Sequence, residues 1–273
     1  MRLIDLFHVG QERVLGSWLV DDVIIDPGPG ATLPALLDAL GDIEPRALLL
    51  THIHLDHAGA SGALVRRWPH LEVWVHERGA PHMADPEKLM ASAARLYGDD
   101  MDRLWGEMVP VPPENMKILT GGEQVGDFRV AYTPGHASHH VSYLHEPSGV
   151  AFTGDTAGVR IGSGVILAPT PPPDIDVPAW LESLAIIEGW RPTRVVPMHF
   201  GAFDDVEQQL ATMRERLADE TEMARTLAEG EFCSAIRARV AEQADERMQA
   251  SYALAMPPDQ SFQGLVRYLR KNL

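Results

Sequence analysis

The sequence of 273 residues predicts a mixed α/β fold with one large domain, or one domain plus a small helical extension. Two observations predict it. Short runs rich in β-branched and aromatic residues alternate with segments of helical periodicity over the first 200 residues, and only helical periodicity follows. A hydrophobic content of 45% is enough to build a substantial core for a chain of this length. Periodicity alone does not define the topology further.

Ten runs are expected to be strands because turn residues flank each of them. They are residues 3–7, 14–20, 23–25, 47–50, 72–76, 117–119, 128–132, 141–145, 150–153 and 194–198. Helices are expected over residues 33–40, 58–68, 177–189, 204–227 and 231–251, with Glu229 and Gly230 separating the last two. Arg267–Lys271 is interpreted as a solvated helix end.

A helical insertion is expected at about residues 81–109. Asp85 is a suitable N-cap, Pro86 fits the first helical position, and Gly98-Asp99-Asp100 should break the helix. An apolar stripe recurs at helical spacing through Met90, Ala94, Tyr97, Met101, Leu104, Trp105 and Met108. Such a stripe is typical of core packing, and its methionine and aromatic content also suits a lid or a dimer face.

Charge and composition exclude several classes of protein. The formal charge of −16 repels phosphate backbones, so no nucleic-acid partner is expected. No run reaches the length of a membrane span, and the N-terminus lacks the continuous apolar stretch of a secretory signal. We therefore expect a cytoplasmic protein without a membrane partner. The single cysteine, Cys233, forbids an internal disulfide and is expected to be a buried thiol.

The segment Thr51–Gly59 places three histidines and one carboxylate in six consecutive positions after an apolar run. In an extended stretch, side chains alternate faces, so His52 and His54 point the same way and can bind one ion. A turn after Leu55 would bring Asp56 and His57 toward a second ion. Burying four such groups without an ion or hydrogen bonds costs several kcal/mol each, which disfavours a plain polar loop.

Three further candidate ligands each follow an expected strand. His136 follows 128–132, Asp155 follows 150–153, and His199 follows 194–198. A single histidine or Gly-Asp pair after a strand is usually an ordinary surface or turn residue. Their order after the His-X-His-X-Asp-His motif is the informative feature, because loops at strand ends are where sites are built on rigid scaffolds.

This series of motifs resembles the metallo-β-lactamase superfamily of metallohydrolases, from about Val14 to about Gly201. The resemblance implies a four-layer αβ/βα sandwich, with a catalytic domain over residues 1–203 and a helical extension over 204–273 packed on it. It also implies two divalent metal ions. His52, His54 and His136 would hold the first ion, Asp56, His57 and His199 the second, and Asp155 would bridge them. Asp26 matches an early acidic position that supports the ligand loop, although Asp-Pro-Gly is also an ordinary turn.

Nitrogen and oxygen ligands without cysteine make zinc the expected metal, with iron and manganese as alternatives. A hydroxide bound by two metal ions would be the nucleophile, and Asp56 would orient it. No nucleophile elbow, phosphate-cradling motif or Cys-His arrangement competes for this role. The sequence therefore predicts a hydrolase.

The resemblance leaves the branch of the superfamily open between the glyoxalase II and lactonase types. The chain has Thr156 to Arg160 where lactonases place a tyrosine, and Ala137 to His140 where glyoxalase II enzymes have one. We expect cleavage of an ester-type bond, such as a thioester or lactone, in a small-molecule substrate. The alternatives are a phosphodiesterase of the same fold, a mononuclear-iron enzyme resembling persulfide dioxygenases, and a non-catalytic metal-binding scaffold. A homodimer through the helical insertion is also possible.

Two segments that emerge beside ligand-bearing loops are expected to wall the substrate pocket: residues 85–108 and residues 157–176. The second contains a stiff proline-rich stretch, Ala168–Asp174. Arg160, His139 and His140 are the polar groups expected in this pocket, and Arg160 could pair with a substrate carboxylate or phosphate.

Overall fold

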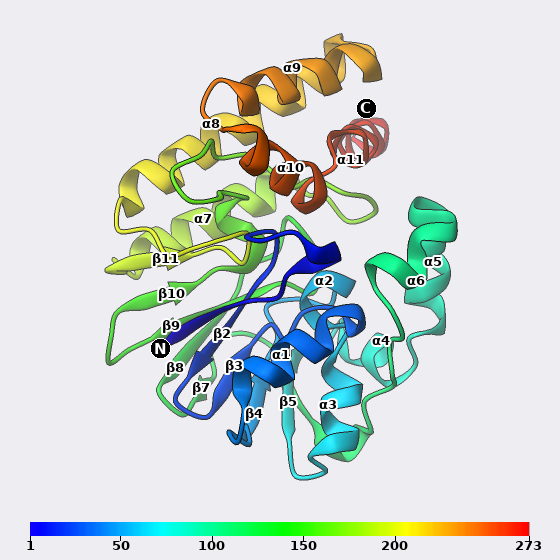
Figure 1. Ribbon diagram of the computed structural model, residues 1–273. Helices are drawn as coiled ribbons and strands as arrows, with labels where there is room; N and C mark the ends of the chain where they lie inside the picture. The colour runs from blue at the N-terminus through cyan, green and yellow to red at the C-terminus, as the bar shows by residue number, and fades with distance from the viewer. Residues whose placement is uncertain (273) are drawn as a thin grey trace. The chain divides into compact units, whose positions relative to one another are not determined.

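The computed structural model describes residues 1–272 of the chain. The chain divides into two compact units, Met1–Glu123 and Gln124–Leu273, each built around its own sheet (Figure 1). The expected boundary at residue 203 lies inside the second unit, and Leu273, the last residue of the expected extension, lies outside the described residues.

The first unit is built on a six-stranded sheet in the order β1-β2-β3-β4-β5-β6. The strands are β1 (Arg2–Asp5), β2 (Gly16–Val20), β3 (Val23–Ile25), β4 (Ala47–Leu49), β5 (Glu72–His76) and β6 (Met116–Leu119). β1 to β3 are antiparallel, whereas β3 to β6 are parallel. β3 and β4 are buried along their whole length, as continuous apolar runs in a parallel sheet should be.

Six α-helices belong to the described part of the first unit. They are α1 (Leu33–Leu40), α2 (Leu55–Ala58), α3 (Ser61–Arg67), α4 (Ala80–Ala84), α5 (Glu87–Tyr97) and α6 (Met101–Leu104). The helix expected over 58–68 is present as α3, but it begins at Ser61, because Ala58 is the last residue of the separate helix α2. The Ala60 N–H donates to the Gly28 carbonyl at 2.8 Å instead of continuing the helical hydrogen bonds of α2.

The insertion breaks where the sequence predicted. Gly98 has a φ of 51°, and residues Gly98–Asp100 form a 3-10 turn between α5 and α6. Trp105 is buried, and its ring stacks on His8 at 5.3 Å and meets the edge of Tyr97 at 4.9 Å. The insertion is thus anchored to the loop after β1 within its own unit. Most of the remaining stripe, including Met90 and Met101, is only half-buried.

The second unit contains a five-stranded sheet in the order β11-β10-β9-β8-β7. Its strands are β7 (Gln124–Val125), β8 (Phe128–Tyr132), β9 (Val141–His145), β10 (Val150–Phe152) and β11 (Arg194–Val196). Only β10 and β11 run parallel. The sequence did not predict β7, whose two residues are too few to show an alternating pattern.

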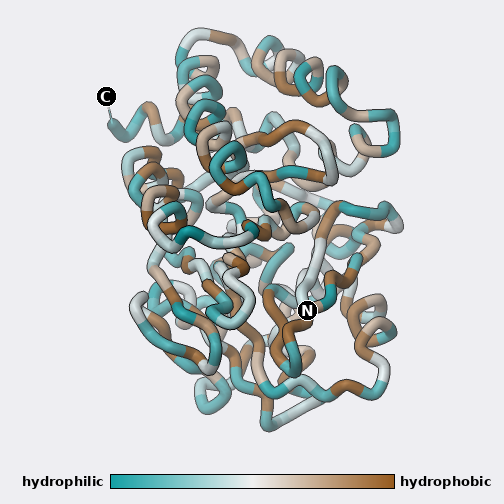
Figure 2. Tube along the Cα trace, turned by 90° about the vertical axis from the view of Figure 1, so that its left-hand side faces the viewer, coloured by the Kyte–Doolittle hydropathy of each residue, from teal (hydrophilic) through white to brown (hydrophobic). Residues whose placement is uncertain are grey.

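The helices of the second unit share one core with its sheet. They are α7 (Val177–Gly189), α8 (Val206–Thr226), α9 (Glu229–Ala241), α10 (Glu246–Ala255) and α11 (Pro258–Lys271). Trp180, Leu210, Phe232 and Leu265 come from four different helices and are all buried in this core. Figure 1 shows α8 to α11 grouped together, in yellow to red, and hydrophilic and hydrophobic positions alternate along these helices (Figure 2).

The C-terminal helices differ from the sequence-based expectation in two places. The helix expected over 231–251 was wrong, because it is two helices: the Asp245 side chain accepts a hydrogen bond from the Met248 amide at 2.8 Å and starts α10. Gly230 lies inside the first turn of α9 and does not separate the helices. Only the end of α11 was expected from the sequence. Among residues 1–272, no helix is both long and apolar enough to cross a membrane.

Glu220 of α8 is a fully buried carboxyl group in the second unit. Burial, with a smaller contribution from the nearby Asp219, raises the pKa of Glu220 to about 8, against the lowering effects of Arg239 on α9, the Ala168 amide and Arg216 on α8. The Arg239 guanidinium lies 3.5 Å from the Glu220 carboxyl. Between the ordinary pKa and about 8, the folded state retains a proton that the unfolded state has released, so stability must fall as pH rises through this window.

Glu220→Gln should remove this pH dependence, since the amide is neutral at every pH. The thermal unfolding midpoint of the natural protein should fall by about 5 °C between pH 6 and pH 8, and that of the variant should fall clearly less. The control is Glu222→Gln, which removes an exposed carboxylate from the same helix and should leave the dependence intact. Parallel pH profiles for Glu220→Gln and the natural protein would contradict the assignment.

Candidate metal centre

The first unit positions four candidate ligands on the chain that follows β4. His52 and His54 occupy extended residues after the strand, and their Nε2 and Nδ1 atoms lie 3.0 Å apart. Asp56 and His57 occupy the short helix α2, so the expected turn after Leu55 is present. The ring centroids of His52 and His57 are 4.0 Å apart, which brings both ligand pairs together.

Asp26 is the buried anchor of this ligand loop. It directly follows β3, and its carboxylate accepts hydrogen bonds from the Thr51 amide at 2.7 Å and the Thr51 hydroxyl at 2.6 Å. The same carboxylate lies 2.8 Å from Nδ1 of His57. Because the Asp26 carboxylate can only accept, His57 must carry a proton on Nδ1. Nε2 of His57 therefore points away from Asp26.

The second unit positions three candidate ligands at the ends of its strands. His136 follows β8, Asp155 lies in a 3-10 turn after β10, and His199 follows β11. The two Asp155 oxygens face different histidines: one lies 3.4 Å from His136 Nε2 and the other 3.5 Å from His199 Nε2. Asp155 therefore has the arrangement that a bridging carboxylate needs.

A backbone carbonyl determines the protonation of His136. Its Nδ1 lies 2.8 Å from the Pro169 carbonyl oxygen, which can only accept, so Nδ1 carries the proton. Trp180 of α7 packs edge-on against the His136 ring, with 5.5 Å between the ring centroids. The Trp180 indole N–H donates to the Thr156 carbonyl at 2.8 Å, which fixes the orientation of the indole. Gly135, with φ of 134°, lets Trp180 approach, because a Cβ there would lie 2.3 Å from the Trp180 Cβ.

The donor set in each unit fits a metal cation. His57 Nε2 lies 3.5 Å from an Asp56 oxygen, and His136 Nε2 lies 3.4 Å from an Asp155 oxygen. Two ligand atoms about 2.0–2.1 Å from one tetrahedral zinc ion are roughly 3.3 Å apart, close to these separations. All seven expected residues are among the side chains that could hold a metal ion: His52, His54, Asp56, His57, His136, Asp155 and His199.

The polar groups expected in the substrate pocket have other surroundings. Arg160 donates from Nη1 to Asp205 at 2.8 Å and to Gln209 at 3.0 Å, and its guanidinium lies over the Phe203 ring at 4.2 Å. This hydrogen bond from Arg160 lowers the pKa of Asp205. The Arg160 amide also donates to the His199 carbonyl at 2.7 Å. Arg160 is thus held within the second unit, and its role toward substrate stays a prediction.

The two histidines after His136 are both buried. His140 lies behind His136, its ring edge-on at 6.1 Å, with Nδ1 3.1 Å from the Thr133 hydroxyl and 3.2 Å from the Thr156 hydroxyl. These contacts support the loop that carries His136. The assignment of His139 and His140 to a substrate pocket likewise stays a prediction.

Comparison with known proteins agrees with this geometry. The family model of the metallo-β-lactamase superfamily matches residues 17–199. A metallo-β-lactamase fold-containing protein, ST1585 of Sulfurisphaera tokodaii, is 33% identical over 59% of this chain and 62% of its own length. A hydroxyacylglutathione hydrolase of Aeromonas hydrophila is 30% identical over 55% of this chain and 47% of its own length. The matched part thus covers less than two thirds of these relatives.

Solved structures show the same fold. The crystal structure of ST1585 superposes with a TM-score of 0.74 over 97% of both chains, at 24% identity. A di-iron-bound form of TTHA1623 gives a TM-score of 0.55 at 29% identity, over 72% of this chain and 93% of that one. The chain belongs to the metallo-β-lactamase superfamily, whose members are generally metal-dependent hydrolases. The expected resemblance and fold class are confirmed.

Asp26→Asn should weaken metal binding while leaving the fold intact, because the amide cannot accept all three hydrogen bonds that the carboxylate accepts. We expect the affinity for Zn²⁺, measured by competition with a chelator, to fall about ten- to a hundred-fold. The matched control is Asp22→Asn, which alters an exposed ion pair with Arg46 in the same unit. An unchanged zinc affinity in Asp26→Asn would show that Asp26 is only a turn residue.

Proposed function

We propose that this protein is a zinc-dependent hydrolase with two metal ions that cleaves an ester-type bond in a small molecule. The observation that carries the proposal is the short separation of imidazole and carboxylate at the His57–Asp56 and His136–Asp155 pairs. Asp26 and the Pro169 carbonyl hold Nδ1 of the two rings, so Nε2 of each ring faces a carboxylate oxygen. An imidazole with its proton on Nδ1 can offer Nε2 to a metal ion shared with that carboxylate.

The number of donors matches two catalytic ions. A catalytic zinc ion has three protein ligands and keeps another position open for water or substrate. The first unit offers three imidazoles and one carboxylate, and the second offers two imidazoles and one carboxylate. Six ligands in two sets of three, with Asp155 shared between the ions, use all seven donors. We therefore propose that these seven donors hold two ions.

Divalent ions held by these residues would lower the pKa of a ligated water and polarise the carbonyl of an ester-type substrate. The chain's own residues supply orientation. Asp56 and His54 are the only half-buried members of the seven, the others being buried. An approaching water or substrate thus meets Asp56 and His54 first, and the Asp56 carboxylate would accept a hydrogen bond from the attacking water. Asp26, Thr51 and Pro169 hold the imidazoles still while this happens.

The relatives support hydrolysis of an acyl bond. Several are named hydroxyacylglutathione hydrolases and are 30–32% identical to this chain. Zinc suits the nitrogen and oxygen donors, and the di-iron-bound form of TTHA1623 makes iron the principal alternative. The substrate is expected to be small, and the chain's net charge of −16 disfavours a nucleic acid.

The identity of the reaction is tested with the protein purified without added metal. Metal analysis should find zinc, and a panel of thioester, lactone, phosphodiester and β-lactam substrates should show turnover of a thioester or lactone. Turnover restricted to phosphodiesters would replace the proposed reaction by a phosphodiesterase. One iron per chain with oxygen consumption, or metal binding without any turnover, would replace hydrolysis by oxidation or by a binding role.

Asp56→Ala should abolish turnover while retaining the fold and at least one metal ion, because it removes a ligand and the acceptor that orients water. We expect a loss of at least about a hundred-fold in kcat. The control is Asp42→Ala, an exposed aspartate in the same unit, which should behave like the natural protein. Near-normal kcat in Asp56→Ala, with metal content unchanged, would exclude this role for Asp56.

A further inference from the structure

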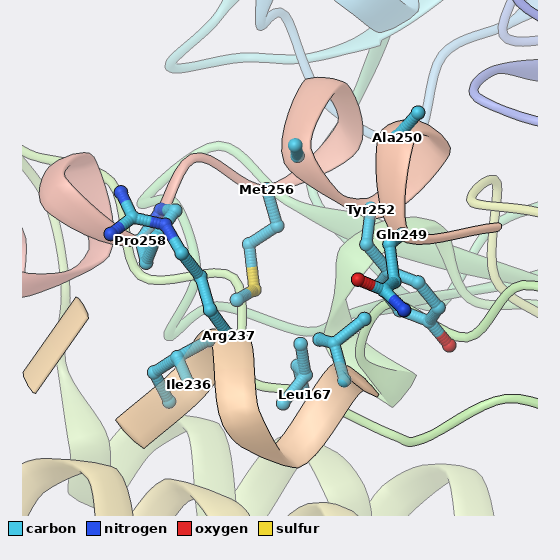
Figure 3. A pocket seen from close by; sticks show the side chains of 10 residues that line it. Leu167, Ile236, Arg237, Gln249, Ala250, Tyr252, Met256 and Pro258 are labelled. Carbon is cyan, nitrogen blue, oxygen red and sulfur yellow. The ribbon is translucent and has the colours of Figure 1, made fainter. Parts of the chain in front are cut away.

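A cavity of about 310 Å³ opens among the C-terminal helices of the second unit. It uses none of the seven expected metal ligands. Figure 3 shows ten side chains around it. They come from α9, α10, the chain between α10 and α11, and the segment after Asp155: Leu167, Ile236, Arg237, Val240, Gln249, Ala250, Tyr252, Ala253, Met256 and Pro258. Its size falls at the lower end of the range for small-molecule sites.

The wall of the cavity is apolar and is part of the folded core. Leu167, Ile236, Val240 and Met256 are all buried members of the core of this unit. In Figure 3 the Met256 side chain extends between Arg237 on one side and the Gln249 and Tyr252 side chains on the other. A methionine is flexible and polarizable, so it can shift to admit an apolar chain with little loss of contact.

The rigid side of the cavity is formed by Tyr252. Its hydroxyl donates to the Val165 carbonyl and accepts from the Ile161 amide at 3.0 Å, so its polar tip is engaged outside the cavity and its ring supplies apolar surface. These two hydrogen bonds fix the segment that precedes Leu167. Pro169, whose carbonyl accepts from His136, follows Leu167 by two residues. The small side chains of Ala250 and Ala253 leave the mouth open on α10.

One charged group lies at this mouth. Arg237 is exposed and is the only charged residue that lines the cavity. Among residues 1–272, no carboxylate lies within ion-pair distance of its guanidinium. In a chain with a formal charge of −16, a guanidinium that no described carboxylate pairs with, beside an apolar cavity, favours an anion over a cation. The amide of Gln249 is the other polar group on the lining.

We propose that this cavity binds a small anionic amphiphile of the medium-chain carboxylate type. The apolar chain lies against Leu167, Val240 and Met256, and the carboxylate pairs with Arg237 at the mouth. Chain burial supplies most of the affinity, at roughly 25 cal/mol per Å² of apolar surface, and the guanidinium supplies the preference for an anion. The site is separate from the proposed hydrolytic centre and does not depend on its reaction.

The test is a titration of the full-length protein, labelled at its methionine methyl groups, with sodium decanoate followed by NMR. The Met256 signal is assigned by comparison with Met256→Leu. Decanoate should shift this signal in a saturable manner. Arg237→Gln should weaken decanoate binding about tenfold and leave 1-decanol binding unchanged, because only the carboxylate uses the guanidinium. Arg270→Gln, an exposed guanidinium of α11 outside the lining, should bind decanoate like the natural protein.

A second experiment fills the cavity with a larger side chain. Ala253→Trp should abolish binding of both ligands while retaining the circular dichroism of the natural protein, and Ala250→Phe replaces it if that variant fails to fold. The proposal is overturned if decanoate leaves the Met256 signal unmoved, if decylammonium binds as tightly as decanoate, or if Arg237→Gln weakens both ligands equally. The Met256 signal reports on binding in this cavity and not on turnover. A failure of decanoate binding is therefore distinguishable from a failure to hydrolyse esters.

Discussion

The site depends on the hydrogen bonds that fix the second nitrogen of its imidazoles. Asp26 holds Nδ1 of His57, and the Pro169 carbonyl holds Nδ1 of His136, so both rings direct Nε2 toward a carboxylate. Without these acceptors each ring could rotate or change tautomer, and the ligand atoms would lose their arrangement. The chemistry proposed for the protein follows from this constraint, since an oriented imidazole nitrogen beside a carboxylate oxygen is a donor pair that suits a metal cation.

Strand order explains how residues distant in sequence reach these positions. β3 and β4 are parallel neighbours in which Ile25 pairs with Leu49, so Asp26 and Thr51 emerge at the same edge of the first sheet. β10 and β11 repeat the arrangement in the second sheet: Phe152 pairs with Val196, and Asp155 and His199 follow. In each unit, an acidic residue follows one strand of a parallel pair, and the residue that it contacts follows the other strand. Sites commonly form at the carboxyl ends of parallel strands in this way.

Much of this could be predicted from the sequence, because metal ligands are recognised by residue type and most strands by short apolar runs. The supporting residues could not. Pro169 acts through its backbone carbonyl, and Trp180 acts through packing against Gly135, so neither leaves a signal in residue type. The division of α9 from α10 was missed because the Asp245 cap lies inside a continuous polar stretch. The ion pair between Arg160 and Asp205 could not be predicted either, because the two residues lie 45 positions apart in the sequence.

The proposal that the seven ligands hold two ions is tested most directly by anomalous diffraction from crystals of the zinc-loaded protein. We predict two zinc ions per chain, roughly 3.5–4 Å apart, with one Asp155 oxygen on each ion. We expect His52, His54 and His136 on one ion and Asp56, His57 and His199 on the other. One fully occupied ion, with His57 and His199 turned away under metal-replete conditions, would contradict it.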